Sequence, residues 1–397
     1  MNKREILHWL HQEDVNALYA QADACRQAHV GDQVHLRGLI EISNHCGRTC
    51  LYCGLRAANA GLGRYRMSRE EILDSARLAR MLGYGSVVLQ SGEDFGLTGE
   101  FIADVVTAIK SLTGGPGGEV PLAVTLSLGE RSDADLLTWR QAGADRYLLR
   151  FETSNPMLFR HIHPSRPGGV CGPGGVGDRV SMLRRLREMG YEIGSGVMIG
   201  VPGQTFDDLA NDILLFAELG LDMIGVGPFL PHPHTPLGAT RVAGVSPACP
   251  ASILPARGGE AGVTSSDTLA NGTHNAGETP ATRDARDMAQ VPNSEAMTYK
   301  TVALTRLTCP RANIPSTTAL ATLNQVQGRE LGLRRGANVV MPNLTPPHYR
   351  RLYEIYPAKA CLYEAPGEFH TGLLARLAAI GRRPGQGPGG VARASRP

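Results

Sequence analysis

Three closely spaced cysteines are the residues of this sequence best suited to chemistry. Cys46, Cys50 and Cys53 follow a C-x3-C-x2-C spacing within the segment HCGRTCLYCG. Three thiolates can bind three irons of a 4Fe–4S cubane and leave the fourth iron open, whereas clusters that only carry electrons usually take four cysteines. An open iron can bind the amino and carboxylate groups of S-adenosylmethionine (SAM), and electron transfer then produces a 5′-deoxyadenosyl radical. The spacing predicts one 4Fe–4S cluster and SAM as cofactors.

Two other interpretations of the cysteines stay open at this point. A structural zinc ion takes four ligands, usually from two paired knuckles. His45 could complete such a set, although the sequence has no second C-x2-C or H-x3-H pair. Outside enzymes, the chain could be an iron–sulfur scaffold or an electron carrier, and the missing fourth cysteine counts against that. The remaining cysteines are scattered without a disulfide framework, which is typical of a reducing compartment.

Apolar, β-rich runs alternate with helical patterns along most of the chain. A capping box at Ser68 and Glu71 predicts the start of one helix, and Thr205 followed by two aspartates predicts another. Near-continuous apolar strands that alternate with helices indicate a parallel sheet covered on both faces. Eight such units favour an α/β fold of the (β/α)8 TIM-barrel type. The expected strands are residues 39–42, 86–90, 122–126, 146–151, 192–199, 223–226, 312–317 and 338–341.

Side chains able to contact a ligand recur where the expected strands end. In a barrel the carboxyl ends of all strands face one mouth, where the active sites of this fold are built. Taken singly, each residue is as well explained as a helix cap or a buried hydrogen bond, so their shared position carries the prediction. They are Gln90, Thr125, Ser127, Arg150, Glu152, Thr317, Thr318 and Met341.

Three stretches break this rhythm. Residues 164–177 are rich in Gly and Pro and are expected to form a loop. Residues 238–293 are rich in Ala, Gly, Pro, Thr and Ser and cannot bury enough apolar surface to fold alone. We therefore expect one barrel domain over residues 1–382, with a disordered insert at about 238–293 and a disordered tail at 383–397.

The overall composition limits the classes of partner. The formal net charge is only +3, and no run of Lys and Arg follows the pattern of a phosphate-binding surface, so nucleic acid is not an expected partner. The N-terminal residues lack the apolar core of a signal peptide, and no stretch of about 18 or more apolar residues occurs. We expect a soluble, cytoplasmic protein that does not interact with a membrane.

Ten short motifs, read in order, resemble the HydE family of radical SAM maturases of FeFe-hydrogenase. The family implies a complete (β/α)8 barrel with the cluster near its top. It also implies a role in assembling the diiron subsite of the hydrogenase H-cluster, on a small iron–cysteine precursor that bears carbonyl and cyanide ligands. Partner maturases and a reduced electron donor are the implied transient partners. The motifs span most of residues 42–359 and are HCGRTCLYCGLR, RYRMS, VVLQSGED, VTLSLGE, GADRYLLRFETSNP, GVPGQTFDDL, IGVGPFLPHPHTPL, ANIPSTTAL, GANVVMPNLTP and YRRLYEIYPAK.

The resemblance also implies roles for individual residues. Cys46, Cys50 and Cys53 would bind the cluster. The residues that would contact SAM are Gln90, Ser127, Glu152 and Arg179. The residues that would line the substrate cavity are Thr125, Arg150, Met223, Thr317, Thr318, Met341, Tyr353 and Tyr356. Some members carry a second cluster motif that begins at the position of Cys361, but the segment CLYEAPGEFHTG lacks its two later cysteines. A single cluster is therefore expected.

Two relatives within the same superfamily are the alternative predictions. Biotin synthase and methylornithine synthase share the barrel and the cysteine triad. A sulfur-donating biotin synthase would need further cysteines for an auxiliary 2Fe–2S cluster inside the barrel. No cysteine follows the fifth or sixth expected strand before the insert, which counts against that activity.

Overall fold

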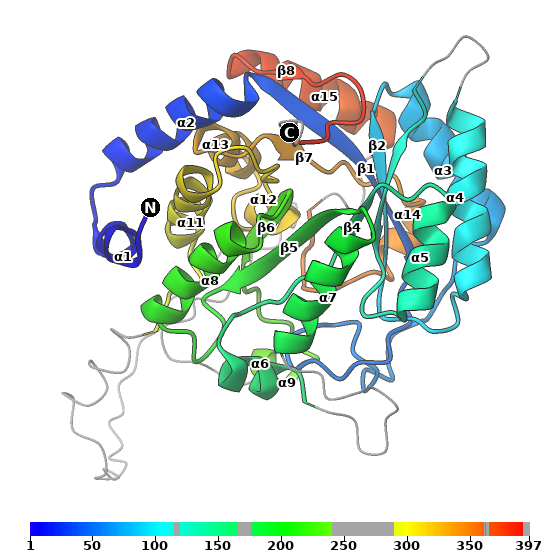
Figure 1. Ribbon diagram of the computed structural model, residues 1–397, viewed down its shortest axis with the longest axis horizontal. Coiled ribbons are helices and arrows are strands. Elements are labelled where there is room, and N and C mark those ends of the chain that lie inside the picture. Colours follow the sequence, from blue (N-terminus) through cyan, green and yellow to red (C-terminus); the bar gives the residue numbers. More distant parts are fainter. Residues whose placement is uncertain (115–119, 165–175, 240–289, 361, 363–364, 392–397) are drawn as a thin grey trace, which may run out of the picture.

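Parallel strands curl around the centre of the protein, as a computed structural model shows for residues 1–114, 120–164, 176–239, 290–360, 362 and 365–391. Neighbouring strands follow the order β6-β5-β4-β3-β2-β1-β7, and β8 pairs with β1. Each crossover from one strand to the next passes over the outside of the sheet (Figure 1). The strands are β1 (Gln33–Ser43), β2 (Ser86–Ser91), β3 (Ala123–Ser127), β4 (Arg146–Leu148), β5 (Glu192–Ile199), β6 (Met223–Pro228), β7 (Val339–Val340) and β8 (Arg383–Pro384).

Helices surround the sheet. Both predicted helix starts are confirmed, because Ser68 and Thr205 each form a capping box at the N-terminus of their helix. Figure 1 shows α3, α4 and α5 outside the first strands and α8 and α11 outside the later ones. The helices are α1 (Lys3–His11), α2 (Asn16–Val30), α3 (Arg69–Met81), α4 (Gly99–Thr113), α5 (Asp133–Gln141), α6 (Pro156–Ile162), α7 (Val176–Glu188), α8 (Phe206–Glu218), α9 (Pro236–Ala239), α11 (Glu295–Thr308), α12 (Thr318–Leu323), α13 (Gly328–Arg334), α14 (Pro347–Arg350) and α15 (Pro366–Ala379).

The seventh predicted strand differs from the structure. Residues 312–317 form no regular strand and bridge their neighbours only at Asn313, which pairs with Met223, and at Pro315, which pairs with Val339. Proline cannot donate to a strand ladder, and side chains replace part of the pairing: the Asn338 side-chain oxygen accepts from the Ile314 N–H at 2.8 Å. The segment still closes the sheet between β6 and β7, so the predicted barrel is confirmed.

The expected disorder of the tail is wrong for residues 383–391. Residues 383 and 384 form β8 beside β1, and the carbonyl oxygens that follow face the amino-terminal end of the barrel. There the buried Arg37 donates to the Gly389 carbonyl at 3.1 Å, and Arg146 donates to the Pro388 carbonyl at 2.9 Å. The tail is therefore held by backbone hydrogen bonds to buried cations, which its low apolar content could not indicate. Residues 392–397 lie outside the described part of the chain.

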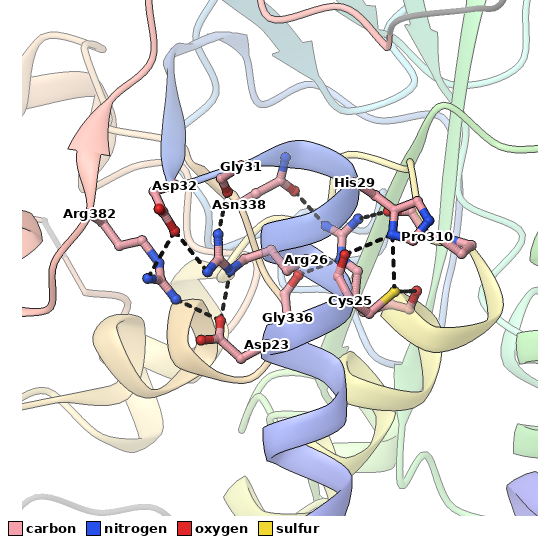
Figure 2. Close-up of polar contacts among 11 residues, drawn as sticks. Asp23, Cys25, Arg26, His29, Gly31, Asp32, Pro310, Gly336, Asn338 and Arg382 are labelled. Atoms are coloured by element: carbon pink, nitrogen blue, oxygen red, sulfur yellow. Dashed lines mark hydrogen bonds and ion pairs between the residues drawn. The ribbon is translucent and has the colours of Figure 1, made fainter.

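Helix α2 is fastened to the same end of the barrel by a charged cluster (Figure 2). Asp23 accepts from Arg26 at 2.7 Å and from Arg382 at 2.6 Å. Asp32 accepts from the same two arginines at 3.1 and 3.4 Å. Two carboxylates thus join α2 to the residue that precedes the tail. Beside them, Arg306 of α11 donates to the carbonyl oxygens of Gly336 and Pro310 and to the Asn338 side chain.

Most of the long insert, residues 240–289, lies outside the described part of the chain, and so do residues 165–175 and Cys361. The insert leaves the barrel after α9 and returns at Gln290, whose backbone bridges Thr205. None of the described helices combines the length and the apolar character needed to cross a membrane.

Replacing Gly85 by alanine should displace the tail from the barrel. A Cβ atom at Gly85 would lie 1.5 Å from the Gly387 carbonyl oxygen, so Gly85→Ala cannot be accommodated unless the tail moves. We expect a loss of about 1–3 kcal/mol in the free energy of unfolding and faster amide exchange in residues 383–391. Gly367→Ala is the matched control, because nothing lies within 4 Å of its Cβ position. Unchanged exchange in the tail of Gly85→Ala would contradict the contact.

Candidate active site

The three cysteines lie on the long loop between β1 and α3, at the carboxyl end of the strands. The loop is anchored by backbone hydrogen bonds from Leu51 to the Ile162 carbonyl at 2.9 Å and from Gly54 to the Ile355 carbonyl at 3.1 Å. At Gly92, after β2, a Cβ atom would lie 2.2 Å from the carbonyl oxygen that precedes Cys46. Only glycine allows this approach, so the loop after β2 packs directly against the cysteine loop.

The three cysteines are half-buried and share one environment. The Cys46 sulfur accepts from the backbone N–H groups of Arg48 and Glu93, both at 3.4 Å. Burial raises the pKa of all three thiols, and that of Cys50 reaches about 12. The neighbouring thiols add to the increase, because Cys46 raises the pKa of Cys50 and both of them raise the pKa of Cys53. The cysteines are therefore close in space as well as in sequence.

This donor set fits the predicted iron–sulfur cluster. Among the described residues, no three His, Cys, Asp or Glu side chains converge as ligands of one metal ion. A cubane cluster does not require such convergence, since each thiolate binds a different iron. Soft thiolate ligands also suit iron–sulfur clusters. Half-buried thiols that repel each other's negative charge need a cation to stay deprotonated, and the irons of a cluster would supply it.

A chain of ion pairs links the cysteine loop to the ends of several strands. Arg48 lies between two of the cysteines and contacts Glu93 at 2.8 Å and Glu130 at 2.7 Å. Glu130 also contacts Arg179 of α7 at 2.8 Å, and Arg179 donates to the Arg150 carbonyl at 2.7 Å. Burial favours a higher pKa for Glu130, but the two arginines outweigh it and lower the pKa. The pKa of Glu93 is raised, because its burial exceeds the effect of Arg48.

The structure gathers the residues predicted to contact SAM around this network. Gln90 and Ser127 lie opposite each other in register at the ends of β2 and β3. Glu152 follows β4 and is buried, and Arg150 binds its two carboxylate oxygens at 2.9 and 3.0 Å. Arg179 lines a small pocket with Cys50, Glu130 and His163 among others.

The residues predicted to line the substrate cavity divide into two groups. The first adjoins the residues predicted to contact SAM: the Tyr353 hydroxyl accepts from Gln90 at 3.2 Å, and Tyr356 interacts electrostatically with Arg150. The Thr125 hydroxyl is buried and finds no hydrogen-bond partner among the described residues. A buried hydroxyl without a partner is costly, so this group is suited to receive a ligand.

The second group lies further from the cysteines or already has a structural role. Met223 begins β6, and its sulfur accepts from Arg37 at 2.8 Å toward the amino-terminal end of the barrel. Thr317 caps α12 by accepting from the Leu320 N–H at 3.4 Å, and Thr318 is the first residue of that helix. Met341 directly follows β7 and is half-buried.

Sequence reasoning missed several residues of the site. Arg48 and Glu130 were not assigned a role, although Glu130 follows β3 by three positions, much as Glu93 follows β2. The position of an acid just beyond a strand end was the signal that could have identified Glu130. The ion pair between Glu41 of β1 and Lys359 gave no signal, because its partners are 318 residues apart in the sequence.

The Glu41–Lys359 pair fixes the segment that carries Tyr353. Both side chains are buried, and the second carboxylate oxygen of Glu41 accepts from Asn343 at 3.0 Å. The Lys359 ammonium also donates to the Tyr353 carbonyl at 3.4 Å and lies 5.1 Å from the centre of the Tyr353 ring. This pair therefore connects Tyr353 to the first strand.

Comparison with known proteins assigns the segment that contains the cysteine loop and the strands after it to a known superfamily. A family model described as the radical SAM superfamily matches residues 40–216. The chain is 40% identical over 374 residues to the FeFe hydrogenase maturase subunit HydE of Thermotoga maritima. That alignment covers 94% of this chain and 88% of the relative.

Other relatives share less of the chain. The 3-methylornithine synthase of Methanosarcina acetivorans is 27% identical over 236 residues, which cover 59% of this chain and 63% of that relative. The crystal structure of methylornithine synthase matches with a TM-score of 0.71 at 22% identity and covers 97% of this chain and 94% of that one. At this identity the structural match shows the shared fold, a radical SAM (β/α) barrel.

Removing the ammonium of Lys359 should destabilise the protein strongly. Lys359→Met would leave the Glu41 carboxylate buried without its cation, and breaking a buried pair in this way costs about 3–5 kcal/mol. Urea unfolding at neutral pH measures the loss. The double variant Glu41→Gln with Lys359→Met removes both charges and should recover most of the stability. If the single variant is as stable as the double variant, the pair does not act as described.

Proposed function

This chain belongs to the HydE family of radical SAM enzymes, and on that premise we propose that it acts in assembling the diiron subsite of FeFe-hydrogenase. The observation that carries the proposal is the loop of three half-buried, mutually interacting thiols at the carboxyl end of a parallel barrel. The identity of 40% to a hydrogenase maturase across 94% of the chain selects this function within the superfamily.

The cofactors are one 4Fe–4S cluster and SAM. Cys46, Cys50 and Cys53 would hold the cluster, which when reduced supplies the electron that cleaves SAM to a 5′-deoxyadenosyl radical. The chain contributes burial of the thiols and the two backbone N–H groups at Cys46. Hydrogen bonds to a cluster sulfur and the exclusion of water both tune reduction potential.

Four residues would bind SAM at the strand ends. Glu152 would accept from the ribose hydroxyls, since its carboxylate is buried at the mouth and lies near enough to Cys53 to raise the pKa of that thiol. Arg179, which shares a pocket with Cys50, would bind the SAM carboxylate by a charge-assisted hydrogen bond. Gln90 and Ser127 would contact SAM from the neighbouring strand ends.

The substrate would be a small iron–cysteine complex with carbonyl and cyanide ligands. The unpartnered Thr125 hydroxyl and the Arg150 guanidinium are donors suited to anionic, cyanide-like ligands in a site that excludes water. Tyr353 and Tyr356 would close the cavity above them. Met223, Thr317, Thr318 and Met341 complete the set of residues that we assign to the cavity wall.

The partners would be other maturases and a reduced electron donor. A maturase that makes the iron–cysteine complex must deliver it, and another protein must receive the product, because such a complex is reactive in water. The electron donor would reduce the cluster before each SAM cleavage. All three contacts are transient.

A second candidate function is that of the methylornithine synthases, which have the same fold. Their similarity in sequence and structure supports it. The sequence match covers only 59% of this chain, however, against 94% for the hydrogenase maturase.

Anaerobic reconstitution tests the cofactors. With iron, sulfide, dithionite and SAM, the protein should form 5′-deoxyadenosine, and Cys50→Ala should reduce the rate at least about a thousandfold, because the open-iron cluster cannot form with two thiolates. Cys25→Ala is the matched control, since this cysteine lies on α2 outside the cysteine loop. Equal 5′-deoxyadenosine formation by Cys50→Ala and the unaltered chain would exclude the proposal.

A maturation assay tests the substrate. The chain should restore hydrogenase activity to a mixture of partner maturases and apo-hydrogenase from which the HydE component is omitted. Thr125→Val keeps the shape of the side chain and removes its free hydroxyl, so we expect about a tenfold slower restoration, the loss of one buried hydrogen bond, with unchanged SAM cleavage in the absence of substrate. SAM cleavage without any restoration of hydrogenase activity would instead favour the methylornithine synthase alternative.

A further inference from the structure

The backbone at Glu152 is held in an unfavourable conformation. Among the described residues, only Glu152 and Ala358 are non-glycine residues with positive φ, and φ of Glu152 is +61°. Residues other than glycine adopt this left-handed conformation at a cost, and they keep it only where the surrounding structure enforces it. Strain of this kind clusters at ligand-binding sites, so the contacts that enforce it are part of the site.

Two sets of contacts hold Glu152, one from the backbone of β5 and one from the Arg150 side chain. Its N–H donates to the Gly196 carbonyl at 3.0 Å, and its carbonyl accepts from the Met198 N–H at 3.3 Å. Its side chain is bound by Arg150 through both carboxylate oxygens. The Thr153 N–H also donates to the Phe151 carbonyl at 2.8 Å, across Glu152. These contacts fix Glu152 and its two neighbours, but none of them reaches Ser154 in the turn that leads into α6.

Asp212 of α8 holds that turn. Its side chain is fully buried, and one carboxylate oxygen accepts from the Ser154 N–H at 2.5 Å. The other lies 3.3 Å from the amide nitrogen of Gln204, which is also fully buried. Gln204 in turn donates to the Met198 carbonyl at 3.1 Å and accepts from the Gly200 N–H at 2.7 Å. Asp212 and Gln204 thus join the turn after β4 to the turn after β5.

A carboxylate at this position is costly for the fold. Burial raises the pKa of Asp212 to about 7, opposed by its hydrogen bond from Ser154 and reinforced by the Asp208 carboxylate one helical turn away. In the described part of the chain, no cation pairs with Asp212. An apolar residue could fill the same space without that cost. What Asp212 provides, and an apolar residue could not, is the hydrogen bond that fixes the backbone beside Glu152.

We propose that Asp212, supported by Gln204, is a positioning residue for SAM. It fixes Ser154, and the turn that Ser154 begins keeps Glu152 in the left-handed conformation that places its carboxylate at the mouth of the barrel. The inference rests on the proposed function, because Glu152 is the residue that would contact the SAM ribose. Asp212 itself is fully buried and would act through the turn without contacting SAM or the cluster.

Equilibrium binding of SAM to the reconstituted full-length protein tests the proposal. Asp212→Ala should weaken SAM binding by about tenfold or more, as expected for losing a hydrogen bond to a charged group. Asp212→Asn should stay within about threefold of the unaltered chain, because its amide oxygen can still accept from the Ser154 N–H. Steady-state assays should show the change in KM for SAM, with kcat nearly unchanged.

Asp222→Ala is the matched control. Asp222 is another buried aspartate that accepts from a backbone N–H, that of Ile193 at 2.8 Å, but at the amino-terminal end of the barrel. The Asp222→Ala variant should have a lower melting temperature than the unaltered chain and the same affinity for SAM. Iron content, measured for every variant, separates a loss of SAM affinity from a loss of the cluster.

The outcomes separate this inference from the proposed function. If the unaltered chain does not bind SAM, the proposed function itself fails. If Glu152→Gln weakens binding and Asp212→Ala does not, the positioning role is wrong and the proposed function stands. If Asp212→Ala does not fold, Gln204→Ala decides: weakening of about threefold or more supports the proposal, and unchanged binding overturns it.

Discussion

The partly buried ion pairs that run from Arg48 through Glu93 and Glu130 to Arg179 are the interaction on which the rest of the site depends. Glu93 and Arg179 are buried, and leaving either charge unpaired would be costly, so the loops that carry these residues are held in positions that pair them. Because Arg48 lies between Cys46 and Cys50, satisfying its charge also places the cysteines. The cysteine loop is thereby positioned by loops that follow other strands as much as by its own sequence.

Arginines meet carboxylates at both ends of the barrel, but the two ends differ in what else the chain provides. At the carboxyl end some groups stay available for a ligand, as the Thr125 hydroxyl does. At the amino-terminal end Arg146 pairs with Glu192, and both Arg37 and Arg146 also donate to backbone carbonyls of the glycine-rich tail. The tail closes the amino-terminal end, while the carboxyl end remains lined with side chains that can bind a ligand. The asymmetry follows the rule that barrels of this type bind ligands at the carboxyl ends of their strands.

Strain and burial are concentrated around the residue that we assign to the SAM ribose. Glu152 adopts a left-handed backbone, which costs about 1–3 kcal/mol where the residue is not glycine. The contacts that maintain it come from β5 and from Asp212 of α8, far along the chain. A preorganised carboxylate needs no rearrangement when a ligand arrives, and the free energy for this arrangement is supplied by folding.

The sequence alone determined the local features of this protein. The spacing of Cys46, Cys50 and Cys53 indicated the cluster, the alternation of strands and helices indicated the barrel, and the capping residues Ser68 and Thr205 marked helix starts. Only the tertiary structure decided the irregular seventh strand, the ordered tail, the Glu41–Lys359 pair and the role of Asp212. Spacing and periodicity act within a few residues, whereas these features depend on buried polar groups that meet partners up to hundreds of residues away. Which partner each group finds is settled by the packed barrel.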